Sequence, residues 1–137
     1  MNRIDLQQLA EARLREAAAL LNAGEWSGTY YLAGYAVECG LKACIAKLTG
    51  LHDFPDKSRV LKSYSHKLVE LVDVADLEPR LDAEILKNPV FRTNWTIVRR
   101  WNETARYAQW TEPEARQLFD AINHPTDGVL SWVKSHW

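Results

Sequence analysis

The chain has 137 residues, of which 47% are hydrophobic and 26% charged, and its formal net charge at pH 7 is −1. This composition is typical of a globular protein with one sizeable core, and it excludes an intrinsically disordered chain. The small net charge also excludes a general electrostatic attraction to nucleic acid, so a site for an anion must come from local clustering of basic side chains. The length predicts a single domain over residues 1–137.

The first predicted helix extends from about Asp5 to Asn22. Asp5 is expected to cap this helix, with Gln8 three residues later as its partner in a capping box. Asn22 and Gly24 are residue types that commonly end a helix. Apolar side chains recur at helical spacing and form one face that we expect to be buried: Leu6, Leu9, Ala10, Leu14, Ala17, Leu20 and Leu21.

A second predicted helix, residues 27–49, is apolar or small around most of its circumference, and Ser27 is expected to cap it. The short link between the two helices predicts an antiparallel hairpin. Four side chains nevertheless fall in one narrow sector, at about 100° per residue: Tyr31, Tyr35, Glu38 and Lys42. Charges at a core boundary are costly unless they are paired or used. This polar stripe is a candidate site, although Glu38 and Lys42 are four residues apart and could simply pair.

Both cysteines, Cys39 and Cys44, lie on this central helix, where a disulfide between them would strain the backbone. We therefore expect reduced, structural thiols and a cytoplasmic protein. Charged residues interrupt the apolar positions near the N-terminus, which argues against a signal peptide. Glu38 and Lys42 interrupt the central helix in the same way, which argues against a membrane span.

The middle of the chain is predicted to be less regular. Residues 50–64 form the longest irregular stretch, and loops of this length are often functional. Ser65 is expected to cap a helix that begins at His66, and residues 77–87 are expected to hold a short helix after Pro79.

Two more helices are predicted in the C-terminal part. Asn88 and Pro89 begin one that extends to about Arg106, with Phe91, Val98, Trp101 and Ala105 buried. Thr111 and Glu114 form a capping-box pattern that begins the last helix, and Pro125 should kink or break it before Val129. Since no segment alternates strictly, we expect an all-α, up-and-down antiparallel bundle of four to five helices.

Three arginines on the predicted helix 88–106, Arg92, Arg99 and Arg106, are spaced by seven residues and should lie along one line beside the buried face. Guanidinium groups bind phosphates through two hydrogen bonds and stack on aromatic rings. Aromatic residues are interleaved with them, among them Trp95 and Tyr107, so the stretch could form a site for a nucleotide or single-stranded RNA. The alternative is a solvated flank whose arginines pair with local acids.

His66 and Arg59 form a second candidate. A neutral imidazole in a groove could act as a general base, although a histidine at the start of a helix is often only a capping or surface residue. Arg59 precedes His66 with six residues between them, and a chain of this composition would show an Arg–His pair at one of three neighbouring spacings about once by chance. The scattered histidines and cysteines have no metal-ligand spacing, so we expect neither a metal nor a cofactor.

These features resemble the HEPN superfamily of helical domains. The resemblance rests on the first hairpin, ARLREAAALLNAGEWSGTYYLAGYAVECGLKACIAK, and above all on its AVECGLKA core with Glu38 and Lys42. The pattern of His66, Leu68 and Leu71, and Arg106–Tyr107 before a final helix, extend it over most of the chain. The resemblance implies a helical bundle, commonly a homodimer, that is associated with nucleotides or RNA. It also implies a nucleotidyltransferase as partner, in a toxin–antitoxin-like pair.

Many members of the family resemble ribonuclease toxins. Their motif is an Arg, then four to six intervening residues, then a His, usually with a polar residue directly after the Arg, and the six residues between Arg59 and His66 fit this spacing. In such an enzyme His would transfer protons and Arg would stabilise phosphate charge, with no metal required. Here Val60 follows Arg59 in place of a polar residue, and no His follows Arg106 within reach.

Three hypotheses follow from the sequence. The first is a domain that binds a nucleotide or an RNA phosphate in a groove lined by Tyr35, Glu38, Lys42, Arg99, Arg106 and Tyr107. The second is a metal-independent endoribonuclease toxin that uses His66 with Arg59 or Arg106. The third is a structural interaction module, in which the polar stripe is a buried ion pair that sets helix register.

Overall fold

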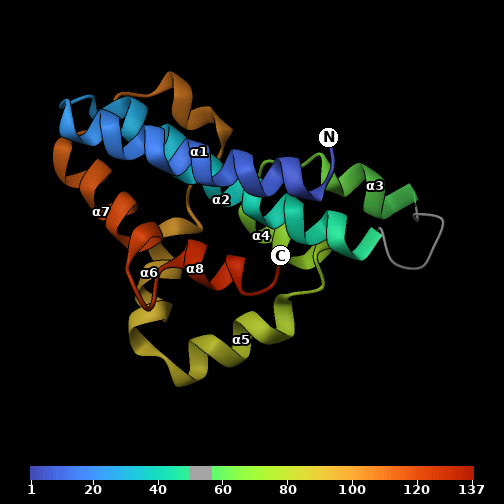
Figure 1. The fold of residues 1–137 in the computed structure, drawn as a ribbon. Coiled ribbons are helices and arrows are strands. Elements are labelled where there is room, and N and C mark those ends of the chain that lie inside the picture. The colour runs from blue at the N-terminus through green and yellow to red at the C-terminus, as the bar shows by residue number, and fades with distance from the viewer. Residues whose placement is uncertain (50–56) are drawn as a thin grey trace.

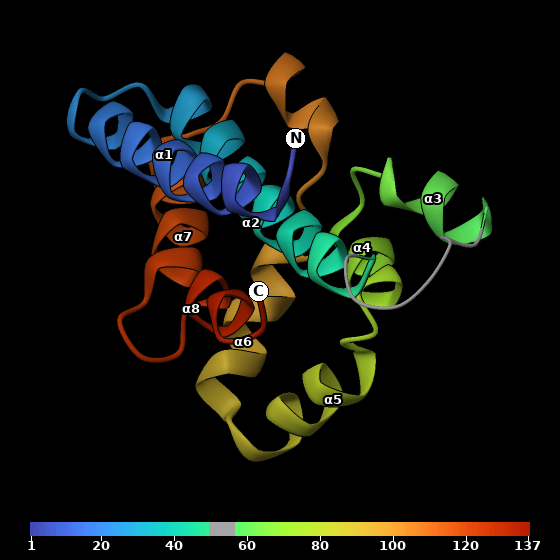
Figure 2. The same ribbon diagram turned by 45° about the vertical axis from the view of Figure 1, so that its right-hand side comes forward.

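The computed structural model describes residues 1–49 and 57–137, and these residues form eight α-helices and one 3₁₀-helix, η1 (Figures 1 and 2). No strand occurs in the described part of the chain, so the prediction of an all-α fold is confirmed. The helices are more numerous and shorter than predicted after the first hairpin. Most of the predicted irregular stretch, residues 50–56, lies outside the described residues, whereas Lys57–Ser63 forms helix α3.

The first two helices, α1 (Arg3–Asn22) and α2 (Trp26–Thr49), lie antiparallel and side by side (Figure 1). Gly24 makes the tight link between them with φ at 78°, a left-handed conformation that glycine adopts at little cost. The N-cap of α1 is Asn2 and not Asp5. The Asn2 side chain accepts a hydrogen bond from the Asp5 amide at 2.9 Å, and the Asp5 carboxylate accepts one from the Asn2 amide at 3.0 Å. Asp5 is thus the third residue of the capping box, which satisfies two amides at once.

Ser27 does not cap α2, which begins one residue earlier at Trp26. The Ser27 hydroxyl instead accepts a hydrogen bond of 2.9 Å from the backbone amide of Trp110. The ring of Trp110 stacks on Tyr30 of the same helix. These contacts hold the segment before α7 against the start of α2, a role that local sequence patterns do not reveal.

Helix α4 (Leu68–Val74) begins two residues later than predicted, which leaves His66 in the connection from α3. The Ser65 hydroxyl accepts a hydrogen bond from the Lys67 amide at 3.1 Å, so Ser65 stabilises this turn instead of capping a helix at His66. Pro79 lies in the first turn of α5 (Glu78–Lys87), which confirms the short helix predicted there.

The predicted helix over 88–106 is divided in two. Asn88 caps α6 (Pro89–Val98) as expected, but this helix ends at Val98, and the 3₁₀-helix η1 (Glu103–Tyr107) follows. Asn102 adopts an extended conformation and its side chain accepts a hydrogen bond from the Thr104 amide at 2.9 Å, which competes with a continuing helix. The prediction of a single helix through Arg106 was therefore wrong.

The last two helices follow the predicted pattern. Thr111 and Glu114 form the capping box of α7 (Glu112–Asn123). The chain breaks around Pro125, as predicted, and continues as α8 (Val129–Lys134).

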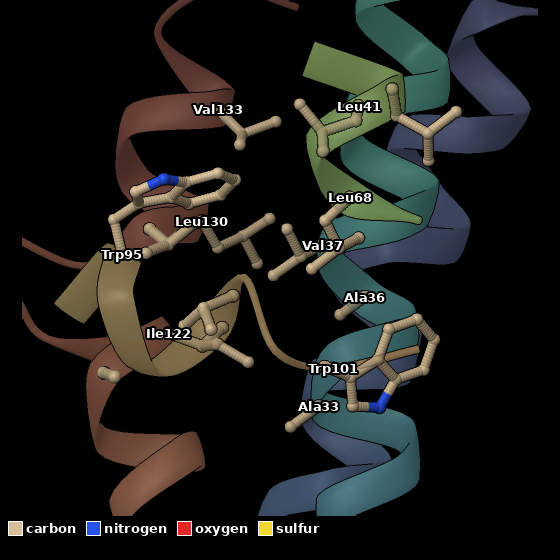
Figure 3. Packing of buried hydrophobic residues seen from close by; sticks show 14 of the residues in the cluster. Ala33, Ala36, Val37, Leu41, Leu68, Trp95, Trp101, Ile122, Leu130 and Val133 are labelled. Carbon is tan, nitrogen blue, oxygen red and sulfur yellow. The ribbon is translucent and has the colours of Figure 1, made fainter. Parts of the chain in front are cut away.

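Helix α2 is the centre of the core, and Figure 3 shows its apolar face directed toward the C-terminal helices. Val37 and Leu41 lie opposite Leu130 and Val133 of α8, and all four side chains are buried. Helix α4 also packs against α2, and Figure 3 shows Leu68 beside Val37 and Leu41. Within the described residues, no helix is both long and apolar enough to cross a membrane. The polar stripe therefore lies on the helix that the rest of the fold surrounds.

Candidate functional site

Glu38 is a carboxylate in the core of the protein, with 2% of its side chain exposed. Its Oε1 atom accepts hydrogen bonds from two basic groups, Lys42 Nζ at 3.0 Å and His66 Nδ1 at 2.8 Å. The predicted pairing of Glu38 with Lys42 is present, and His66 joins it from the segment before α4. We call Tyr35, Glu38, Lys42 and His66 the Glu38 cluster.

The two basic partners reach solvent where Glu38 does not. The Lys42 side chain is 23% exposed and the His66 side chain is 47% exposed. A proton on His66 Nδ1 would be donated to Glu38, and this tautomer leaves the lone pair on Nε2. No hydrogen bond to Nε2 occurs among the described residues. The buried carboxylate thus orients an imidazole whose second nitrogen can accept a proton.

The second carboxylate oxygen of Glu38 is also buried, and it has no hydrogen-bond partner in the described part of the chain. Leaving a buried acceptor unsatisfied costs about 1–3 kcal/mol. Such a group points to a role other than stability, because stability alone would favour an apolar residue at this position.

Aromatic rings continue from the Glu38 cluster toward the start of α2. Tyr31 and Tyr35 stack with ring centroids 6.0 Å apart, and Tyr31 stacks on Trp101 at 6.1 Å. Burial, and next the neighbouring Cys39 and Glu38, raise the pKa of Tyr35, so its phenol stays protonated. Trp101 lies where a side chain on Gly34 would otherwise be, because a Cβ on Gly34 would overlap the indole ring.

Arg106 lies on η1, which packs against α2. Its guanidinium is 4.8 Å from the centroid of the exposed Tyr107 ring, a cation–π distance. The neighbouring phenol of Tyr107 raises the pKa of Arg106, and the phenol of Tyr31 raises it further. Arg106 therefore carries its charge at the Tyr31 end of the stripe, and the Glu38 cluster occupies the other end.

Arg99 does not lie on this surface. It follows the end of α6 and lines a separate cavity of about 480 Å³, together with Trp95 and residues of α4 and α5. Four carboxylates line the same cavity: Glu70, Asp73, Glu78 and Asp82. The predicted line of Arg92, Arg99 and Arg106 is therefore wrong, because a spacing of seven aligns side chains only along a continuous helix and the helix ends at Val98.

Arg59 and His66 have different partners. The Arg59 guanidinium on α3 binds both carboxylate oxygens of Asp76, at 3.3 and 3.2 Å, whereas His66 binds Glu38. None of the hydrogen bonds or ion pairs of the described residues joins Arg59 to His66. The geometry therefore gives no support to these two residues acting as a pair.

Cys39 and Cys44 are both buried and free, as predicted. Burial is the main cause that raises the pKa of each thiol to about 11. Each thiol is therefore protonated at neutral pH and is a poor nucleophile. Cys39 adjoins Glu38 in sequence, yet it contributes no reactive group.

Glu38 and His66 were both predicted site residues, but their pairing was not predicted. The two residues are 28 positions apart, and their contact depends on the path of the connection between α3 and α4. The available signal was a buried charge on an apolar helix, which requires more compensation than one partly exposed lysine provides. Trp101 was expected only as a core residue, and its stacking on Tyr31 was missed.

Comparison with known proteins gives one match. A family model described as HEPN domain matches residues 5–136, which is nearly the whole chain. No curated protein and no solved structure matches. The match covers the hairpin with the Glu38 cluster, the connection with His66 and the C-terminal helices. The chain therefore belongs to the HEPN family.

Proposed function

We propose that this HEPN domain binds the phosphate-bearing backbone of a nucleotide or RNA along the exposed side of the α2 stripe. The observation that carries the proposal is the order of groups on this surface. Arg106 lies at one end, the stacked rings of Tyr31 and Tyr35 follow, and Lys42 and His66 lie at the other end. From Tyr31 to Lys42 the helix rises about 16 Å, long enough to contact more than one nucleotide.

Each type of group on this surface suits a part of a nucleotide. Lysine and arginine side chains neutralise phosphates, and aromatic rings stack on bases. Glu38 is too deeply buried to meet the ligand directly, but it holds Lys42 and His66 by hydrogen bonds to one oxygen. Its role is thus to position the two groups that do face solvent.

Fluorescence anisotropy with a labelled single-stranded RNA, and with labelled ATP, tests the proposal. Replacing Arg106→Ala should weaken binding about tenfold at low salt, about 1.4 kcal/mol, because one phosphate contact is lost. Arg99→Ala removes the same charge from the separate acidic cavity and should leave the affinity unchanged. Both side chains are exposed, so neither variant should lower the melting temperature much. Failure of the unmodified protein to bind RNA or ATP would refute the proposal.

A second function, metal-independent ribonuclease activity, is favoured by the orientation of His66. With Nδ1 held by Glu38, Nε2 is free to take the proton of a ribose 2′-hydroxyl. The alkoxide would attack the adjacent phosphorus, which would form a 2′,3′-cyclic phosphate and release the 5′-oxygen of the next nucleotide with a proton. Arg59 is held by Asp76, and Arg106 lies at the opposite end of the stripe, so the cation beside His66 that could stabilise this phosphate is Lys42, which binds the same Glu38 oxygen.

Cleavage of 5′-labelled RNA in the presence of a chelator tests this activity. His66→Ala should abolish cleavage and should relieve growth arrest on overexpression, with RNA binding reduced less than cleavage. Arg59→Ala should leave the cleavage rate unchanged. Intact RNA after incubation with the unmodified protein, or equal cleavage by the His66 variant, would leave binding as the function.

We also propose that the domain acts as a homodimer in the cytoplasm and is partnered with a nucleotidyltransferase in a toxin–antitoxin-like pair. Membership in the HEPN family supports both partners, and the two free thiols agree with a reducing compartment. An adjacent nucleotidyltransferase gene, and co-purification of its product with this protein, would support the pair. A neighbourhood without such a gene would count against it.

A further inference from the structure

The structure contains a cavity of about 860 Å³ at the far end of α2 from Arg106. It lies between the beginning of α1, the second half of α2 and the end of α3. In Figure 2 the N-terminus lies close to these segments. Its lining includes Arg3, Leu6, Lys42, Ile45, Lys47 and Tyr64.

Among the described residues, the charged side chains that line this cavity all carry positive charge. They are Arg3, Lys42 and Lys47, and no Asp or Glu is among the described lining residues. Lys42 is paired with Glu38, and Lys47 donates a hydrogen bond to the His136 carbonyl at 3.4 Å. Arg3 has no hydrogen-bond or ion-pair partner in residues 1–49 and 57–137. In a chain with a net charge of −1, this local excess of cations favours an anion.

The uncharged lining suits the less polar part of the same ligand. Leu6, Ile45 and Ala46 provide an apolar wall, and the Tyr64 ring is 73% exposed. An exposed phenol beside lysines can stack on a base while the cations hold the phosphate. A simple inorganic anion would leave the aromatic and aliphatic lining unused.

The cavity adjoins the Glu38 cluster through one shared residue. Lys42 belongs to both, and Tyr64 precedes His66 by two positions. The cavity therefore extends the row of cations and aromatic rings from the stripe toward the C-terminal end of α2.

We propose that this cavity binds the flanking nucleotide of a single-stranded RNA, with Arg3 and Lys47 on its phosphate and Tyr64 on its base. The inference rests on the proposed function and sharpens it: the ligand is an RNA strand of several nucleotides and not a mononucleotide. The stripe holds one part of the strand, and the cavity holds the part beyond Lys42.

The test is the salt dependence of binding, measured by anisotropy with a labelled eight-nucleotide RNA and with labelled ATP. The double variant Arg3→Ala, Lys47→Ala should bind the RNA about tenfold more weakly at low salt. Its slope of log K against log salt should be shallower by about 0.7, since each neutralised phosphate of a single strand contributes about 0.7. The control Lys87→Ala, Arg92→Ala removes the same charge from α5 and α6 and should change neither quantity.

The outcomes separate this inference from the proposed function. The double variant and the control could bind RNA with equal affinity and equal salt dependence. That result would overturn the proposal that the cavity binds RNA but would leave the stripe as the binding site. If the double variant lost as much affinity for ATP as for RNA, the cavity would be a mononucleotide site. That result would overturn the proposal that the ligand is an RNA strand. Absence of RNA and ATP binding by the unmodified protein would overturn both.

Discussion

At the residue scale, Glu38 is the position where the chemistry of this protein is concentrated. A carboxylate that is 2% exposed is stable only with partners, and here a single oxygen serves two of them. Lys42 lies one helical turn away and is available from local geometry, whereas His66 arrives from a distant segment. Because His66 and Lys42 both reach solvent, their hydrogen bonds connect the buried carboxylate of Glu38 to the protein surface.

The first prediction concerns the charge of Glu38. Glu38→Gln should lower the free energy of unfolding by about 1–3 kcal/mol, because the variant keeps the shape but removes the negative charge that the two basic groups bind. Glu70→Gln is the matched control, since Glu70 is exposed and its pairing with Lys67 should contribute little. Chemical denaturation measures both.

A Glu38 variant as stable as the control would show that the pairing contributes nothing to the fold. Destabilisation with unchanged RNA binding would favour the third hypothesis, in which the ion pair only sets helix register. Destabilisation together with weaker binding would favour a positioning role for Glu38.

At the scale of elements, the contact between α2 and the segment joining α6 to η1 determines the shape of the candidate surface. Trp101 is buried directly over Gly34, and its ring in turn supports Tyr31. The chain leaves the helical path after Val98 and places Arg106 beside α2. A helix continuing through these residues would have kept Arg99 and Arg106 on one line.

The second prediction is that Gly34→Ala strongly destabilises the protein. A Cβ at this position would overlap the Trp101 indole, which must move. Overpacking of this kind costs about 1–3 kcal/mol, or a fall in melting temperature of roughly 3–10 °C for a domain of this size. Thermal unfolding followed by circular dichroism measures the change.

The control for this prediction is Gly28→Ala on the same helix. There a Cβ would lie 3.0 Å from Leu20 Cδ1, the end of a flexible side chain that can shift. Alanine also has the higher helix propensity, so Gly28→Ala should be neutral or slightly stabilising. Equal melting temperatures for the two variants would mean that the Trp101 packing is not as close as the structure shows.

At the scale of the whole molecule, α2 is both the centre of the core and the base of the candidate site. One side contacts α7 and α8 and the other carries the stripe, the Glu38 cluster and the large cavity. Substitutions on the apolar side should therefore affect folding, and those of the solvent-exposed groups beside the stripe should affect the ligand. The two cavities have opposite charge: the described lining of the one beside α2 is cationic, and that of the one beside α5 is mainly acidic. The first therefore attracts an anion and the second repels it.

The third prediction follows from the proposed homodimer. Size-exclusion chromatography with multi-angle light scattering should give about twice the chain mass of 15.7 kDa. An interface that is maintained by apolar contact should persist at high salt, unlike RNA binding. A constant monomer mass over the accessible concentration range would contradict the dimer.

The sequence by itself determined the helical class, the first hairpin and several of its boundaries. Capping residues such as Asn88 and Thr111, and the break near Pro125, act within a few residues, so local patterns suffice to predict them. The stripe on α2 was also readable, because helical periodicity assigns side chains to a face without knowledge of the partner.

Only the tertiary structure decided which residues meet. In the folded protein His66 pairs with Glu38, and Arg59 pairs with Asp76. Because α6 ends at Val98, Arg99 and Arg106 lie on different surfaces. The physical reason is that these contacts depend on where connections place segments far apart in the sequence, and burial of Trp101 against Gly34 outweighs local helix propensity there. The stripe could thus be predicted from the sequence, whereas the Glu38 cluster and the cavity beside it depend on the tertiary structure.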